Sequence, residues 1–64
     1  MIMEPVSSSA IQALGWEDNV MVVRYTNGTD YAFSGISFDT FEAIKESGSI
    51  GRAVQGCGVK GQRL

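Results

Sequence analysis

The chain has 64 residues, so it can hold only one hydrophobic core, and we expect a single domain over residues 1–64. It has one cysteine and no histidine, which excludes an intramolecular disulfide and the common zinc ligand sets, and we expect no metal and no cofactor. The net charge is −2, but residues 1–46 hold all seven acids and only two basic residues, whereas residues 47–64 hold three basic residues and no acid.

The start of the chain, Met1–Pro5, lacks the basic segment and the long apolar run of an export signal. No later stretch approaches the apolar length that spans a membrane. We therefore expect a cytoplasmic protein with no membrane partner. A domain this small buries a limited share of its surface, so assembly into a homo-oligomer would add stability.

The first predicted strand is Ala10–Trp16, which follows three serines whose side chains can cap the backbone where a strand begins. The polar turn Glu17–Asn19 would lead into a second, antiparallel strand. The segments Val20–Tyr25 and Thr29–Phe33 are rich in β-branched and aromatic residues. Together these segments predict a three-stranded antiparallel meander.

Asn27-Gly28 separates the last two predicted strands, and this pair is preferred in two-residue type I′ hairpin turns. A loop of these two residues pairs Thr26 with Thr29 and Arg24 with Tyr31. Both faces of the resulting hairpin carry apolar side chains, so periodicity does not decide which face packs in the core.

A helix is predicted near residues 38–47. Ser37 is a good N-cap, and Gly48 suits the left-handed position that follows many helices. Three apolar residues recur at helical spacing and need a sheet to pack against: Phe38, Phe41 and Ile44.

The rest of the chain predicts less structure. A second short helical turn is expected near Ser49–Gln55, and three glycines make residues 56–64 a loop or a basic, glycine-rich tail. The fold class is therefore α+β: a small antiparallel β-meander of about three strands, packed against one or two short C-terminal helices.

Motifs that suggest chemistry have simpler explanations. Residues 56–61 spell G-x-G-x-x-G, but the chain ends three residues later, with no room for the helix that a dinucleotide site requires. Cys57 has no histidine to activate it. Among the acids, Asp39 belongs in the first helical turn, and Glu42 and Glu46 form an exposed pair. We expect no enzymatic activity.

Aromatic side chains could instead bind bases by stacking, although so small a domain also needs them for its core. Arg24 opposite Tyr31 would suit RNA best, because a guanidinium beside a ring offers both a stacking surface and a phosphate contact. The alternative explanation of this pair is an ordinary cross-strand cation–π contact.

Short motifs spread over nearly the whole chain occur in a characteristic order: Val6–Ser9 with Ile11, Tyr25-Thr26-Asn27-Gly28, Tyr31-Ala32-Phe33, Gly35-Ile36, Phe41–Ile44, Ser49-Ile50-Gly51 and Val59-Lys60. In this order they resemble the KTSC domain family, named after the C-terminal extension of some lysyl-tRNA synthetases and also found as stand-alone small proteins. The chain departs from the family at Phe33, which replaces the second tyrosine of the central Y-x-Y motif, and at Ala53-Val54, where aromatic residues are usual; the closing tyrosine is absent. The resemblance implies an α+β fold, no known enzymatic activity and a suggestion of RNA binding.

Our first interpretation is a non-catalytic binding module for RNA, whose binding residues are Arg24, Tyr31, Arg52, Lys60 and Arg63. The alternative is a small bacterial or phage protein that binds protein. It would form a homo-oligomer, or dock on or inhibit a partner, through an exposed strand edge or an apolar second face. The basic end of the chain favours RNA, and the acidic first two-thirds favours protein.

Overall fold

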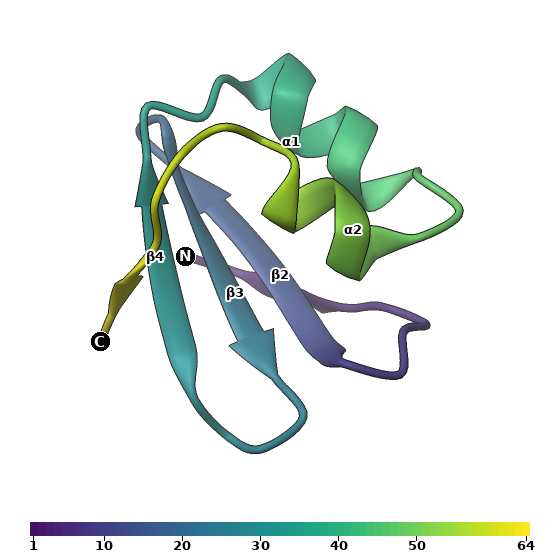
Figure 1. Ribbon diagram of the computed structural model, residues 1–64. Coiled ribbons are helices and arrows are strands. Elements are labelled where there is room, and N and C mark those ends of the chain that lie inside the picture. The colour runs from purple at the N-terminus through teal and green to yellow at the C-terminus, as the bar shows by residue number, and fades with distance from the viewer.

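The computed structural model describes residues 1–64 as five strands and two short helices. In chain order the elements are β1 (Met3–Pro5), β2 (Ile11–Glu17), β3 (Val20–Tyr25), β4 (Asp30–Ser34), α1 (Phe38–Lys45), α2 (Ile50–Gln55) and β5 (Gln62–Arg63). The strands form one antiparallel sheet in the order β1-β2-β3-β4-β5. Both helices lie on one face of the sheet, and the chain then returns beside β4 as β5 (Figure 1). The α+β class is confirmed, with five strands in place of three.

The core lies between the helices and one face of the sheet. Its buried apolar residues are Ile11, Leu14, Met21, Val23, Phe33, Ile36, Phe41, Ile44, Ile50 and Val54. Met21 and Val23 of β3 are completely buried, which identifies the core face that periodicity left open. The alternate residues of β3 lie on the opposite face, which no helix covers (Figure 1).

Neither helix has the length and apolar composition needed to cross a membrane.

The turn between β2 and β3 contains only Asp18 and Asn19, because Glu17 pairs with Val20. Both turn residues have positive φ angles, 51° and 63°. A two-residue type I′ turn needs a left-handed backbone at both positions, and Asp and Asn tolerate this better than other residues with a side chain. The polar turn predicted over Glu17–Asn19 is confirmed at Asp18 and Asn19, whereas Glu17 belongs to β2.

The loop between β3 and β4 has three residues, Thr26 to Gly28, so the predicted register is wrong by one residue. The N–H of Tyr25 donates to the carbonyl of Thr29, and the N–H of Gly28 donates to the carbonyl of Tyr25, both at 2.9 Å. Gly28 has a φ of 87°, as expected for the left-handed residue that completes a three-residue hairpin loop. The Asn27 side chain accepts from the N–H of Thr29 at 3.0 Å and stabilises the loop.

This register changes which residues face each other. Arg24 pairs with Asp30, and Val23 pairs with Tyr31. A slip of one residue moves every side chain of one strand to the other face relative to its neighbour. Arg24 and Tyr31 therefore lie on opposite faces of the sheet, and the predicted contact between them is wrong.

Helix α1 begins as predicted and ends earlier. The Ser37 side chain accepts a hydrogen bond from the N–H of Thr40 at 3.2 Å, which satisfies one of the free donors of the first turn. The helix ends at Lys45, where the N–H of Ser47 donates to the carbonyl of Ile44 and closes the last turn without a glycine. Gly48 does not adopt the predicted left-handed conformation. Helix α2 agrees with the expected helical turn.

The sequence did not predict the two edge strands. Residues 56–64 are not all loop, because β5 pairs with β4 and the N–H of Leu64 donates to the carbonyl of Asp30 at 2.9 Å. Gly61 permits this path, since a β-carbon there would lie only 2.6 Å from the Phe33 ring. At the other edge, β1 pairs with β2, where Gly15 leaves room for the Met3 side chain.

Candidate functional site

The five residues predicted to bind a ligand do not form one site. Tyr31 and Arg63 are paired across β4 and β5. Lys60 is exposed, three positions before Arg63. Arg24 lies on the opposite face of the sheet, and Arg52 belongs to α2.

Tyr31 and Arg63 help line a hollow of about 450 Å³ beside the loop between β3 and β4. We call it the tyrosine hollow, and its residues are Tyr25, Asn27, Thr29, Tyr31 and Arg63. The rings of Tyr25 and Tyr31 meet edge to face, with centroids 5.5 Å apart. Directly paired residues of an antiparallel sheet extend from the same face, so the Arg63 side chain leaves β5 on the Tyr31 side.

The charges of the tyrosine hollow are unbalanced. Arg63 is its only charged residue, no carboxylate lines it, and Arg63 takes part in none of the ion pairs of the structure. Burial raises the pKa of the Tyr25 hydroxyl, and the nearby Tyr31 and Cys57 raise it further. A tyrosine is protonated at neutral pH even without this shift, so the Tyr25 hydroxyl can donate a hydrogen bond. The hollow can hold an anionic group next to an aromatic ring.

Arg24 has a different environment. Its Nε donates to Asp30 Oδ1 at 3.0 Å and its Nη2 donates to Asp30 Oδ2 at 3.2 Å, so the guanidinium is held at two points. This contact raises the pKa of Arg24. The adjacent carboxylate neutralises Arg24, which makes it a poor partner for a phosphate.

Arg52 lies at a third hollow, of about 320 Å³, between α2 and the segment before β2. One of the serines that line it, Ser8, has a structural use, because its Oγ accepts from the N–H groups of Ala10 and Ile11 at 3.3 Å. This agrees with the predicted capping role of the serine segment.

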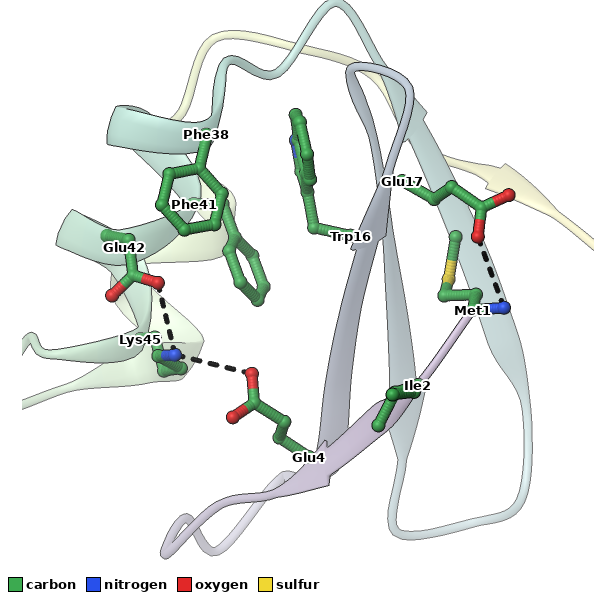
Figure 2. A pocket seen from close by; sticks show the side chains of 9 residues that line it. All are labelled: Met1, Ile2, Glu4, Trp16, Glu17, Phe38, Phe41, Glu42 and Lys45. Carbon is green, nitrogen blue, oxygen red and sulfur yellow. Dashed lines mark hydrogen bonds and ion pairs between the residues drawn. The ribbon is translucent and has the colours of Figure 1, made fainter.

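The largest hollow was not predicted from the sequence. It is a groove of about 550 Å³ between β1 and α1, which we call the aromatic groove, lined by Met1, Ile2, Glu4, Trp16, Glu17, Phe38, Phe41, Glu42 and Lys45 (Figure 2). Trp16 and Phe38 meet edge to face with centroids 5.3 Å apart, and the Trp16 indole donates to the carbonyl of Ile36 at 2.7 Å. The rings are thus held in place by packing and by one hydrogen bond.

One end of the aromatic groove is bridged by Lys45. Its ammonium group lies 3.3 Å from a Glu4 oxygen on β1 and 3.2 Å from a Glu42 oxygen on α1 (Figure 2). The hydrogen bond to Glu42, followed by that to Glu4, raises the pKa of Lys45. Two carboxylates therefore share this cation.

A geometric signal for the groove was present in the sequence. At about 100° per residue, Phe38 and Ile44 lie about 120° apart around the helix. Both cannot face the centre of the core, and Phe38 is in fact 50% exposed, whereas Ile44 is buried. The other wall was not predictable, because β1 is only three residues long and contacts α1 across 41 positions of the chain.

The groups that carry metal or nucleophilic chemistry are scattered. No three His, Cys, Asp or Glu side chains are placed to hold a metal ion. Cys57 is a half-buried free thiol whose sulfur lies 3.8 Å from the Val59 carbonyl oxygen.

Comparison with known proteins identifies related chains. A family model described as the KTSC domain matches residues 7–56, a range that includes Tyr25 and Tyr31 but not Arg63. A protein of Tsukamurella paurometabola is 34% identical over 56 residues, which cover 84% of each chain. The crystal structure of a KTSC domain protein from Yersinia pestis matches with a TM-score of 0.88 and 22% identity, over 98% of this chain and 96% of that one.

Proposed function

The chain belongs to the KTSC domain family, and we propose that it is a non-catalytic module that binds single-stranded RNA at the tyrosine hollow. The observation that carries the proposal is the pairing of Tyr31 with Arg63, a cation that no carboxylate neutralises. The resemblance to a domain that extends some lysyl-tRNA synthetases is consistent with an RNA ligand. A cytoplasmic location is part of the same proposal.

In the proposed complex, one base stacks on the half-buried Tyr31 ring while Arg63 contacts the adjoining phosphate. Base–aromatic stacking contributes about 1–3 kcal/mol per base and tolerates any sequence. Asn27 and Thr29 supply polar groups at the same hollow, where a ribose hydroxyl can form hydrogen bonds. A hollow of about 450 Å³ has the size of a small-ligand site, so it suits a single flexible nucleotide and not a duplex.

Few cations can contact RNA phosphates at the tyrosine hollow, so RNA affinity is expected to depend only weakly on salt concentration. Arg63 and the exposed Lys60 are the cations nearest each other along the chain. Each phosphate neutralised on a single strand contributes a log–log slope of about −0.7, so two contacts give roughly −1.4. Binding is thus expected to depend on stacking as much as on charge.

The test is a titration of fluorescently labelled oligouridine RNA by anisotropy, at several salt concentrations. Arg63→Ala should weaken binding and flatten the slope by about 0.7, and loss of Lys60 as well should bring the change to about 1.4. Tyr31→Leu should weaken binding and leave the slope unchanged, because stacking releases no counterions.

Arg24→Gln is the matched control, because it removes a cation from the opposite face of the sheet. It should leave RNA affinity unchanged. An equal loss with Arg24→Gln would move the binding surface to the open face, and absence of binding at low salt, where attraction is strongest, would exclude the RNA proposal.

A separate observation favours the protein-binding alternative. Ile2 and Phe38 line the aromatic groove and are 84% and 50% exposed, which places two large apolar side chains in water at one surface. Contiguous apolar patches of this kind often mark protein contacts.

A further inference from the structure

The aromatic groove is built from rings that the core does not fully use. Phe41 forms part of the buried core, but Trp16 is half-buried and Phe38 is half-exposed. Figure 2 shows these three rings on the helix side of the groove and Met1 and Ile2 on the β1 side. An apolar side chain placed between the two sides would cover Phe38 and Ile2 together and remove both from water.

The charged groups that line the groove have a net charge of −1. Its lining contains the carboxylates of Glu4, Glu17 and Glu42, against the Lys45 ammonium and the Met1 amino group. The Met1 amino group balances Glu17 at 3.2 Å, whereas Lys45 is shared by Glu4 and Glu42 and can balance only one of them. The excess negative charge therefore lies at the Lys45 end of the groove.

Helix α1, which forms one side of the groove, also carries two exposed acids outside the groove lining. Asp39 follows Phe38 directly, and Glu46 caps the end of the helix. A polyanion such as RNA is repelled by this arrangement, whereas a basic ligand is attracted.

We infer that the aromatic groove is a docking site for a segment of another protein that presents one large apolar side chain flanked by lysine or arginine. The apolar side chain would enter between Phe38 and Ile2, and the basic flanks would lie beside Glu42 and Glu4. β1 is an edge strand, so the free backbone groups on its outer side can also pair with an extended segment. The inference is independent of RNA binding, which uses the tyrosine hollow.

The chain provides its own probe for this site. Trp16 is the only tryptophan, and it lines the groove, so its fluorescence reports whether the groove is occupied. The ligand would be a synthetic peptide of about nine residues with a central leucine between lysines, free of tryptophan. One control peptide replaces each lysine by glutamate, and a second replaces the leucine by serine.

Titration of the lysine–leucine peptide should change Trp16 emission in a saturable way, and each control peptide should bind at least about tenfold more weakly, a difference of about 1.4 kcal/mol. Raising the salt concentration should weaken the binding, because the attraction between the charges is screened. Glu42→Gln should weaken it as well. Equal binding of the glutamate peptide, or no response to any peptide, would overturn the inference.

Variants of the protein test whether the peptide binds at the groove or elsewhere on the surface. Ile2→Ser should weaken peptide binding about tenfold without loss of stability, because the side chain is 84% exposed. Leu64→Ser is its matched control, since Leu64 is 73% exposed but lies by β5 at the other edge of the sheet. Phe38→Ser should also weaken peptide binding about tenfold, provided that its thermal unfolding shows that the variant is folded.

Two further outcomes would contradict the inference. If oligouridine RNA displaced the peptide and changed Trp16 emission, the groove would be a nucleic-acid site. If sedimentation showed a dimer that Ile2→Ser dissociates, the occupant would be a second copy of this chain. Failure of RNA binding at the tyrosine hollow would leave the peptide result unaffected, so the two proposals can fail separately.

Discussion

The aromatic groove and the tyrosine hollow each combine aromatic rings with a lysine or arginine, but the two cations have different neighbours. Lys45 in the groove is shared by Glu4 and Glu42, whereas Arg63 in the hollow has no carboxylate beside it. Strand register causes part of this difference, because it sends the Asp30 carboxylate to the opposite face, where it binds Arg24. An aromatic ring beside a cation therefore indicates an anion-binding site only where no carboxylate already pairs with that cation.

The largest expected effect distinguishes the two phenylalanines of the groove. Phe41 is 3% exposed and belongs to the core, so Phe41→Ala should lower the free energy of unfolding by about 3–5 kcal/mol, comparable to the whole stability of a small domain. Phe38→Ala should cost much less, because the side chain is half-exposed. Thermal unfolding followed by circular dichroism measures both. Equal melting temperatures for the two variants would show that Phe41 is not a core residue.

The second-largest effect is expected from a substitution that disrupts the tyrosine hollow and leaves the aromatic groove intact. Gly61→Ala would place a β-carbon against the Phe33 ring, and overpacking of this kind costs about 1–3 kcal/mol. We expect β5 to detach from β4 and Arg63 to leave Tyr31. Amide hydrogen exchange should show lost protection at Leu64, whose N–H bonds to Asp30.

Gly48→Ala is the control for this variant, because its added β-carbon meets open space and its φ is not positive. It should be neutral or slightly stabilising. If Gly61→Ala behaved in the same way, the close packing of β5 over Phe33 would be wrong.

Prediction from sequence succeeded where local signals decide the structure. The Ser37 cap and the turn at Asp18-Asn19 are short-range features, and both were identified. The loop at Asn27-Gly28 was misjudged because the same pair fits a two-residue or a three-residue loop, and the choice reverses which residues share a face. Tyr31 and Arg63 were both predicted site residues, but their pairing depends on β5, which no local pattern indicates.

A smaller effect is expected on the free energy of unfolding at alkaline pH, where each region has one group with a raised pKa. The pKa of Tyr25, in the hollow, and that of Lys45, in the groove, are both raised in the folded protein. A raised pKa means that the folded state holds the proton more tightly than the unfolded state. The stability it contributes is complete below the unfolded pKa, about 10 for both residue types, and is lost as the pH rises through the folded pKa.

Urea unfolding at several pH values around this range measures the loss. Tyr25→Phe should make the loss of stability with rising pH smaller, because this variant lacks the hydroxyl whose burial is the main cause of the raised pKa. Lys45→Met should have a weaker influence, since exposed ion pairs contribute little to stability. A stability that rises above pH 10 would contradict both assignments.

The most direct test of the central claim is an NMR titration of the isotope-labelled protein with oligouridine RNA at low salt. The account predicts that the signals of Tyr31, Arg63 and the loop residue Asn27 shift together and saturate. The indole N–H signal of Trp16 should stay in place, because the aromatic groove repels the phosphates. Shifts at Trp16 and Lys45 with none at Arg63, or no shifts at all, would contradict the assignment of RNA to the tyrosine hollow.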